Sequence, residues 1–408
     1  MSNVSWADFV VNDIPCVDEN TWKLLLDINS IDDIIDDLTN WIVENNVPFP
    51  SQNINEQECL KRFKELFKND LKSLWVNEKP VFTLDYENPG ESFGILQIGH
   101  YYNIISDLFQ RKNRMKCGSY TKYSPYAVWT GMGFTKDEHK KILRQALSGL
   151  KNEKKLDYTG YRACMRLGSN VYTAPQFRVH AAKQIYQYFN AKNIIDFSAG
   201  WGDRLAAFFA NPGTVFYLGI DPNIETYSTY IEQCKNYDKW RADKNYKEPV
   251  LKVEWDHFVF KSESTGITVI IYNLPAEDTD LSIYTGTFDL AFTSPPYYCI
   301  EKYAEHLRSQ QMQSWYRYNT PDLWLQGFLK PVVQKVKRTL KTNGILAINI
   351  TDPVVNKKRG GRVFAYNCLR EALKDMTFIG NIGLRTIKRP NIKIVDKLSC
   401  EPIWIWRN

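Results

Sequence analysis

The sequence predicts an α/β fold in which a mainly parallel sheet carries helices on both faces, preceded by a mainly helical N-terminal section. Three observations support this prediction. Short apolar segments alternate with helical patterns from about residue 156, glycines follow the first of these segments, and polar residues follow several others. Seven strands are expected, near residues 193–197, 215–220, 267–272, 288–293, 344–350, 378–384 and 401–406.

Five helices are expected among these strands, near residues 179–190, 203–210, 224–237, 321–340 and 363–375. The fourth helix has the clearest start, because Thr320-Pro321-Asp322 places a proline in the first helical turn. Pro331 should kink or divide this helix, since proline cannot donate the backbone hydrogen bond that a helix interior needs.

Residues 1–155 are predicted to form a mainly helical domain, with a possible role in substrate recognition, and residues 156–408 the α/β domain. A chain of 408 residues has room for both. Apolar residues recur with helical period between residues 55 and 71, and Thr135 with Glu138 forms a capping box that opens a further helix.

Charge is unevenly distributed along the chain. Residues 1–100 contain 7 Lys and Arg against 18 Asp and Glu, a net −11, whereas the other 308 residues contain 45 against 28, a net +17. A basic section of this size suggests a surface that binds a polyanion.

Two basic stretches are candidates for that surface. Arg111–Lys116 precedes the tyrosines of 120–126, and basic residues beside aromatic ones are typical of single-stranded nucleic-acid binding. The alternative is that these aromatic residues fill a core. The second stretch is a basic loop expected to clamp a phosphate backbone, or else to form a solvated turn. It contains Lys357, Lys358, Arg359 and Arg362.

Cysteine and histidine patterns indicate neither a metal site nor disulfide bonds. The eight cysteines include no Cys-x-x-Cys pair, and the five histidines are scattered. No run of 18 apolar residues and no secretory signal is visible, so we expect no membrane span and a reducing, cytoplasm-like compartment.

A glycine loop follows the first predicted strand. Ser198-Ala199-Gly200-Trp201-Gly202 joins this strand to a helix, and glycines here allow positive φ and close approach of a ligand. Asp221 ends the next strand, where an acidic residue would accept hydrogen bonds from ribose hydroxyls. The loop lacks the full Gly-x-Gly-x-x-Gly fingerprint, and Asp203 at the helix start would repel a pyrophosphate. The pattern therefore favours an adenosine ligand that has no pyrophosphate.

The fourth predicted strand ends in Thr293-Ser294-Pro295-Pro296-Tyr297-Tyr298. The two prolines fix φ and remove two N–H donors, so the loop offers carbonyl oxygens beside the Ser294 hydroxyl and the Tyr297 ring. This arrangement suits a planar group that carries an NH2, with two acceptors for its N–H bonds and a ring to stack on it. Such acceptors favour the pyramidal amine that forms in a transition state. The alternative is a simple strand exit in which Pro-Pro stops the strand.

In these motifs the sequence resembles the S-adenosylmethionine-dependent amino-methyltransferases of nucleic acids. These are the DNA N4-cytosine and N6-adenine methyltransferases, particularly the methylase-like proteins of phages and large viruses. The resemblance covers roughly Tyr161 to Asn408. It implies a Rossmann-like methyltransferase fold that ends in an antiparallel pair of strands, S-adenosylmethionine as cofactor, and a nucleic-acid partner, DNA more than RNA.

The resemblance also implies roles for individual residues. The residues implied to contact the cofactor are Phe177, Arg178, Asp196, Ser198, Ala199, Gly200, Gly202, Asp221, Glu277 and Asp278. The catalytic loop is implied to be Ser294, Pro295, Pro296 and Tyr297, and we expect Tyr298 beside the substrate.

Several alternatives stay open from the sequence. Serine at the first loop position is more usual in the cytosine enzymes, but those enzymes commonly place the catalytic loop before the cofactor loop, so the target base is open. Methylation of a glutamine side chain in a protein would meet the same planar NH2 problem. A catalytically inactive subunit that binds nucleic acid is a third interpretation, and the oligomeric state is not indicated.

Overall fold

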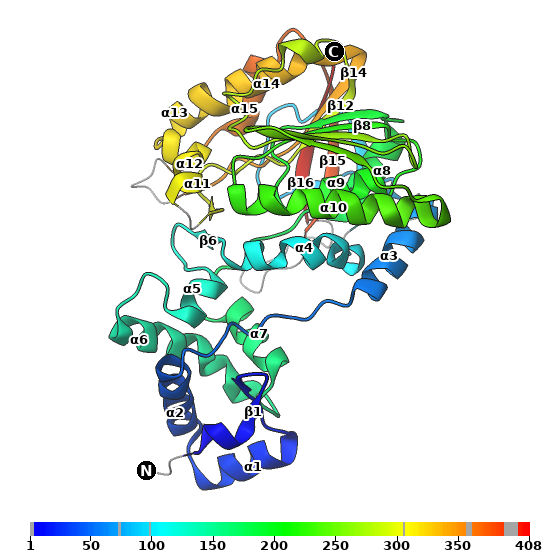
Figure 1. Ribbon diagram of the computed structural model, residues 1–408. Helices are drawn as coiled ribbons and strands as arrows, with labels where there is room; N and C mark the ends of the chain where they lie inside the picture. The colour runs from blue at the N-terminus through cyan, green and yellow to red at the C-terminus, as the bar shows by residue number, and fades with distance from the viewer. Residues whose placement is uncertain (1–3, 72–74, 98, 305–306, 356–360, 387–398) are drawn as a thin grey trace. The chain divides into compact units, whose positions relative to one another are not determined.

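The protein is described by a computed structural model that covers residues 4–71, 75–97, 99–304, 307–355, 361–386 and 399–408 (Figure 1). The chain folds into two units. The helical unit comprises Met1–Asn53, Lys112–Pro175 and Glu301–Glu305. The sheet unit comprises Ile54–Arg111, Gln176–Ile300 and His306–Asn408.

These units do not follow the predicted boundary between residues 155 and 156. Residues 54–111 belong to the sheet unit, because the strand at Ser92–Leu96 pairs with a strand near the C-terminus. Residues 156–175 belong to the helical unit, where Tyr161 is fully buried in the core. Pairing across such sequence distances has no local signal in the sequence.

The helical unit is built on amphipathic helices. They are α1 (Glu19–Ile28), α2 (Ile31–Glu44), α5 (Pro125–Thr130), α6 (Lys136–Leu147) and α7 (Tyr158–Leu167), with 3-10 turns at Trp6–Phe9 and Ser148–Asn152. The predicted capping box is present, since the Thr135 hydroxyl accepts from the Glu138 amide and the Glu138 carboxylate accepts from the Thr135 amide. Trp22, Leu38 and Trp129 lie in the core of this unit.

Two short pairs of strands complete the helical unit. β1 (Val10–Val11) and β2 (Ile14–Pro15) form a hairpin, and β6 (Gly118–Ser119) pairs antiparallel with β13 (Glu301–Lys302). β13 thus adds to this unit a segment that comes from far along the chain, soon after the predicted catalytic loop.

The sheet unit has one large sheet, which contains twelve strands in the part of the chain that the structure describes. In spatial order they are β3 (Trp75–Val76), β5 (Ser92–Leu96), β15 (Thr377–Arg385), β16 (Ser399–Arg407), β14 (Leu340–Asn349), β12 (Phe288–Thr293), β7 (Asn193–Asp196), β8 (Phe216–Ile220), β11 (Thr268–Tyr272), β10 (His257–Lys261) and β9 (Val250–Val253), and β4 (Val81–Phe82) pairs with β16.

The seven predicted strands are all present and adjacent, from β15 to β11. β11, β8, β7, β12 and β14 are parallel, and β15 and β16 form the expected antiparallel pair. The sheet has more strands than the seven predicted, because five further strands lie at its two sides. β9 and β10 extend the sheet beyond β11, and β3, β4 and β5 extend it at the other side.

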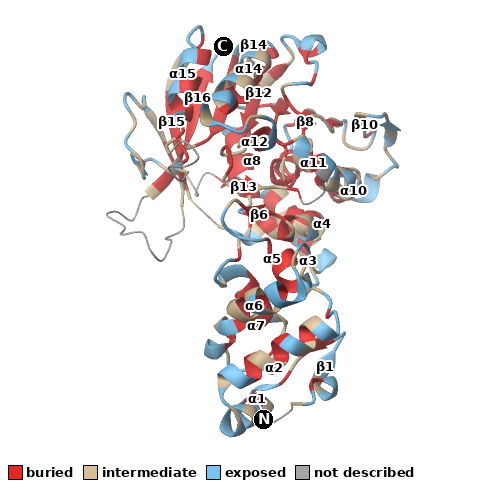
Figure 2. Ribbon diagram, turned by 90° about the vertical axis from the view of Figure 1, so that its left-hand side faces the viewer, coloured by how far each residue is buried: buried red, intermediate tan, exposed pale blue. Residues whose placement is uncertain are grey.

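Helices cover both faces of the sheet (Figure 1). On one face lie α3 (Glu56–Lys68), α8 (Val179–Tyr188), α9 (Asp203–Phe209) and α10 (Ile224–Ala242), whose apolar residues join one cluster with the strands. On the other lie α14 (Lys330–Lys337) and α15 (Ala365–Ala372). Figure 2 shows the buried residues gathered in the strands and in the sides of the helices that face them. The further helices are α4 (Ile104–Met115), α11 (Leu307–Gln311), α12 (Ser314–Arg317) and α13 (Pro321–Trp324), with 3-10 turns at Tyr101–Asn103, Asp243–Asn245 and Ser282–Tyr284.

The helix predicted at 321–340 is present but changes its winding in the middle. The Thr320 side chain caps α13 by accepting from Leu323, and a π-helical turn at Leu325–Leu329 leads into α14. The Lys330 amide donates to the Leu325 carbonyl, five residues back. Pro331 follows directly and has no N–H, so the wider turn lets the helix continue past a residue that breaks the usual bonding.

Candidate functional site

The carboxyl ends of the parallel strands bring the predicted glycine loop, Asp221 and the proline loop together. Parallel strands end at the same edge of a sheet, where ligands of such folds bind. Three hydrogen bonds join the segments. The Gly200 amide donates to Asp221 Oδ2 at 2.8 Å, the Ala199 amide donates to the Ile220 carbonyl at 2.9 Å, and Thr293 Oγ1 donates to Asp196 Oδ1 at 2.7 Å. The three motifs therefore form one connected site.

Asp196 supports the glycine loop from inside the protein. Its side chain is fully buried, and its carboxylate accepts from Arg204 Nε at 2.7 Å, Tyr217 Oη at 2.7 Å and Thr293. Arg204 also donates to the Ser198 carbonyl. These bonds tie Asp196 to the helix and strands around the glycine loop, so its carboxylate helps to position this loop. The cofactor contact that the resemblance implies for Asp196 stays a prediction.

The two glycines have the positive φ that their place in the loop predicts. Gly200 has φ of 62° and Gly202 has φ of 73°, which side chains other than glycine rarely adopt. A Cβ atom on Gly202 would also lie 2.5 Å from Gln233 Nε2. The turn before α9 therefore needs glycine at both positions.

Asp221 is buried at the end of β8, with 8% of its surface exposed. Its Oδ1 accepts from the Asn223 amide at 2.9 Å, and its Oδ2 from Gly200. Burial raises the pKa of Asp221 to about 7, although these two backbone donors oppose the shift. Each oxygen keeps a lone pair, so a ligand hydroxyl that donates to this carboxylate would stabilise its charged form.

Phe177 and Arg178 lie at the start of α8, held by Asn103. The Asn103 side chain donates to the Phe177 carbonyl at 3.1 Å and accepts from the Val179 amide at 3.3 Å. Arg178 Nε is buried and has no hydrogen-bond partner among the described residues. Burial lowers the pKa of Arg178, while the charges of Glu401, Asp203 and Tyr297 raise it. A guanidinium whose buried Nε has an unused donor suits an anionic ligand.

Asp203, which the sequence placed at the helix start, is almost completely buried. Its Oδ1 accepts from the Ser106 hydroxyl and from Gln176 Nε2, the latter at 2.9 Å. Gln176 also donates to Ser106 Oγ at 2.9 Å. This network could not be predicted, because Ser106 lies 97 residues before Asp203 and no local pattern links them.

In the proline loop, Ser294 and Tyr297 are half-buried, and Pro295 is buried. The Tyr297 hydroxyl donates to the Asn349 carbonyl at the end of β14, at 3.2 Å. This bond holds the Tyr297 ring in the same loop that carries the Ser294 hydroxyl. The loop thus contains the hydroxyl, the proline carbonyls and the aromatic ring that the sequence predicts.

Tyr298 differs from its predicted place beside the substrate. It is buried, with φ of 54°, and its hydroxyl donates to the Asn319 carbonyl at 2.7 Å. Its ring packs edge-on against Trp324, with centroids 6.0 Å apart. The positive φ turns this side chain into the protein, so Tyr298 anchors the loop from inside.

Glu277 and Asp278, whose predicted cofactor contacts stay predictions, both pair with Arg317. Arg317 Nη1 lies 2.7 Å from Glu277 Oε1 and 2.9 Å from Asp278 Oδ2. Burial raises the pKa of Glu277, and the Arg317 charge partly offsets the shift. No sequence pattern indicates this partner on α12. At the end of β11 it is Asn273 that reaches the site, because its Nδ2 donates to the Asp221 carbonyl at 2.9 Å.

The basic stretches have mixed outcomes. Lys357, Lys358 and Arg359 lie outside the described residues, whereas Arg362 pairs with buried Asp352 at 3.1 Å. In the helical unit, Arg114 is buried and donates to the Ala174 carbonyl at 3.1 Å, and Lys116 lies over the Tyr126 ring. Arg362 and Arg114 therefore have structural partners, which the polyanion interpretation did not anticipate.

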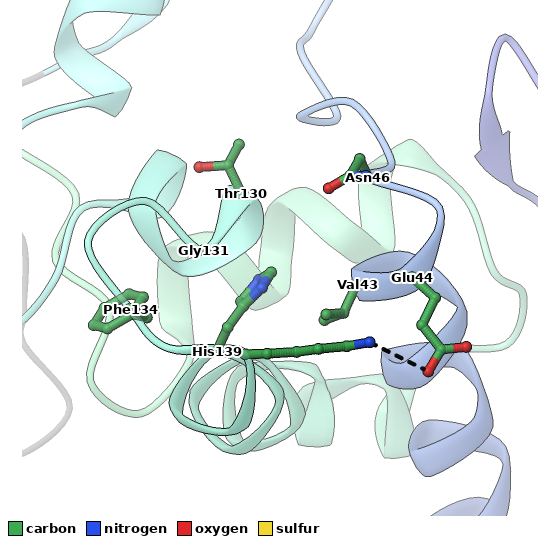
Figure 3. Close-up of a pocket in the computed structure, with 8 residues that line it drawn as sticks. Val43, Glu44, Asn46, Thr130, Gly131, Phe134 and His139 are labelled. Carbon is green, nitrogen blue, oxygen red and sulfur yellow. Dashed lines mark ion pairs between the residues drawn. The ribbon is translucent and has the colours of Figure 1, made fainter.

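One open cavity of about 470 Å³ lies in the helical unit (Figure 3). It is lined by Val43, Glu44, Asn46, Thr130, Gly131, Phe134, Lys136 and His139. Lys136 Nζ and Glu44 Oε1 are 4.0 Å apart across it, and His139 is held by the Trp129 carbonyl. No residue predicted for the cofactor or for catalysis lines this cavity.

Within the described ranges, no helix is long and apolar enough to cross a membrane. The same residues contain no cluster of three His, Cys, Asp or Glu side chains arranged to hold a metal ion.

Comparison with solved structures finds methyltransferases at low similarity. The chain is 13% identical to the 1,6-didemethyltoxoflavin-N1-methyltransferase of Burkholderia thailandensis, solved with S-adenosylhomocysteine, over 56% of this chain and 77% of that one (TM-score 0.32). It is 12% identical to Trm1 from Pyrococcus horikoshii in complex with S-adenosyl-L-methionine, over 57% of this chain and 56% of that one (TM-score 0.32).

A third similar structure is the 16S rRNA (adenine(1408)-N(1))-methyltransferase from Catenulisporales acidiphilia, 12% identical over 58% of this chain and 94% of that one (TM-score 0.29). No family model matches the sequence, and no curated protein does.

Proposed function

We propose that the protein is an S-adenosylmethionine-dependent methyltransferase that modifies the exocyclic amine of a nucleobase, cytosine N4 or adenine N6, in DNA or RNA. The observation that carries this proposal is the direct bonding of the glycine loop to Asp221 and of Asp196 to the strand that enters the Ser294–Tyr297 loop. One edge of the sheet thus offers an adenosine-binding pattern and an amine-binding pattern together.

The residues at this edge fit the cofactor chemically. Asp221 has lone pairs for two ribose hydroxyls, and Gly200 leaves room for a ligand against the backbone, since a Cβ atom there would have no neighbour nearer than 3.8 Å. Arg178, with its unused buried donor, suits the carboxylate of the amino-acid tail. When bound, S-adenosylmethionine supplies an electrophilic methyl group on its sulfonium sulfur.

The Ser294 hydroxyl and the Pro295 carbonyl are proposed to accept the two N–H bonds of the target amine. These two hydrogen bonds favour a pyramidal nitrogen, whose lone pair can attack the methyl group. The bonds become strongest as positive charge develops on that nitrogen. The proton then leaves after the new bond has formed, so no strong base is needed. The Tyr297 ring, held by Asn349, stacks on the base. A base in a duplex must first be flipped out.

Transfer of labelled methyl groups from S-adenosylmethionine to mixed DNA and RNA tests this proposal. We expect label in nuclease-sensitive material with the unaltered protein, and a large loss with Ser294→Ala. Label in protein instead would support the glutamine alternative. Cofactor binding without any transfer would support the inactive-subunit alternative. Either result would contradict the proposal.

A further inference from the structure

The β9–β10 hairpin brings an exposed tryptophan to the ligand edge of the sheet. β10 runs antiparallel to β11, and His257, the first residue of β10, lies opposite Tyr272, the last residue of β11. The turn between β9 and β10 therefore projects at the carboxyl edge of the parallel strands, where β8 ends in Asp221. Trp255 stands in this turn with 87% of its surface exposed.

The turn is tied to the predicted ribose-binding strand end. The Glu254 amide donates to the His257 carbonyl at 2.8 Å and closes the turn. The Asn273 amide donates to the Asp256 carbonyl at 2.7 Å, and the Asn273 side chain donates to the Asp221 carbonyl at 2.9 Å. Asn273 thus links the hairpin to the site, so that Trp255 is presented on a fixed support.

The surroundings of Trp255 favour a flat, uncharged ligand. Lys252 Nζ lies 2.6 Å from Glu254 Oε1, so these two charges neutralise each other. Asp256 Oδ1 lies 2.7 Å from His257 Nδ1. The turn therefore has no surplus of positive charge for a phosphate. Exposed Val253, two residues before Trp255, adds apolar surface. An indole in such a setting offers its π face, which every nucleobase can stack on.

We propose that Trp255 stacks on an unpaired base of the polynucleotide, outside the target base that enters the Ser294–Tyr297 loop. This inference rests on the proposed function and adds a second base-binding point to it. A tryptophan at this place would hold the polynucleotide on the β11 side of the sheet, because β7 and β8 lie between β11 and the strand that leads into the Ser294–Tyr297 loop, and it would do so without counterion release.

The test compares Trp255→Ala with a matched control, Ile283→Ala. Ile283 is 75% exposed and lies in the segment that enters β12 at its amino end. Binding of a labelled single-stranded oligonucleotide of mixed sequence is measured at several salt concentrations, and S-adenosylmethionine binding is measured by calorimetry. We expect Trp255→Ala to weaken oligonucleotide binding about tenfold or more, with an unchanged salt slope. Trp255→Phe should keep most of the affinity, and Ile283→Ala should bind normally.

Three results would overturn the inference and leave the proposed function standing. They are oligonucleotide binding by Trp255→Ala that equals the control, a reduced salt slope, and a loss of cofactor affinity in place of oligonucleotide affinity. Failure of the unaltered protein to bind any oligonucleotide would instead contradict the proposed function together with the inference.

Discussion

At the level of single residues, we expect Asp221 to make cofactor binding depend on pH. Burial raises its pKa to about 7, so in the free protein a large share of this carboxyl is protonated near neutrality. Ribose hydroxyls that donate to it favour the charged form, so binding should release a proton, and affinity should fall as the pH drops below 7. Calorimetry across this pH range, in buffers of different ionisation enthalpy, measures both effects.

Asp221→Asn is the matched variant for this prediction. It should bind the cofactor about 1–3 kcal/mol more weakly and lose the pH dependence. The same raised pKa has a consequence for folding. Between pH 3.8 and about 7 the folded protein keeps a proton that the unfolded chain has released, so the contribution of Asp221 to stability falls as the pH rises. Cofactor affinity that is independent of pH in the unaltered protein would show that Asp221 does not meet the ligand.

Ser294 and Tyr297 should separate chemistry from binding. Ser294→Ala is expected to lower kcat much more than cofactor affinity, because its bond to the amine matters most in the transition state. Tyr297→Phe loses the bond to the Asn349 carbonyl and should keep the stacking, whereas Tyr297→Ala should also lose about 1–3 kcal/mol of base binding. Initial rates of oligonucleotide methylation distinguish these variants, and full turnover in Ser294→Ala would remove this hydroxyl from the mechanism.

At the level of helices and strands, Lys183 joins α8 to the end of α3. Its buried ammonium donates to the carbonyls of Leu66, Phe67 and Asn69, the last at 3.0 Å, and burial lowers its pKa to about 8. A cation at a helix C-terminus satisfies carbonyls that have no partner within the helix. Lys183→Met should therefore cost about 2–4 kcal/mol of unfolding free energy in urea, because buried carbonyls lose their donor. Exposed Lys68→Met is the control, and equal stability of the two variants would contradict this role.

Elements could be predicted from the sequence where one strand or one helix carries its own pattern. All seven expected strands and the capping box at Thr135 are present. The two-residue strands β4, β6 and β13 were not predicted, because each pairs with a segment that is distant in sequence. The β9–β10 hairpin was also missed, although its two strands are neighbours in sequence. The roles predicted for the loop residues stay predictions. The Arg317 partner of Glu277 and the inward position of Tyr298 could not be predicted, because the first lies on another element and the second depends on a positive φ.

For the whole molecule, the charge asymmetry predicts binding that weakens with salt. Residues 101–408 carry the net +17, and binding to phosphates releases counterions, so the affinity for a polynucleotide should fall linearly on a log–log plot of salt. Replacing Lys357, Lys358 and Arg359 together by glutamine should reduce this slope by up to about one for each phosphate that is no longer neutralised. Exposed Lys112→Gln tests the competing stretch at 111–116. If Lys112→Gln reduces the salt slope and the triple variant does not, the phosphate contacts belong to the stretch at 111–116 and not to the loop at 357–359.

We propose above all that the glycine loop, Asp221 and the Ser294–Tyr297 loop form one site for methyl transfer to a nucleobase amine. Mass spectrometry of nucleosides tests this most directly, after DNA and RNA of mixed sequence are incubated with the full chain and S-adenosylmethionine. We expect N4-methylcytosine or N6-methyladenine in one of the polymers, and much less of it with Ser294→Ala. Unmodified nucleosides from a protein that binds S-adenosylmethionine tightly would contradict the proposal.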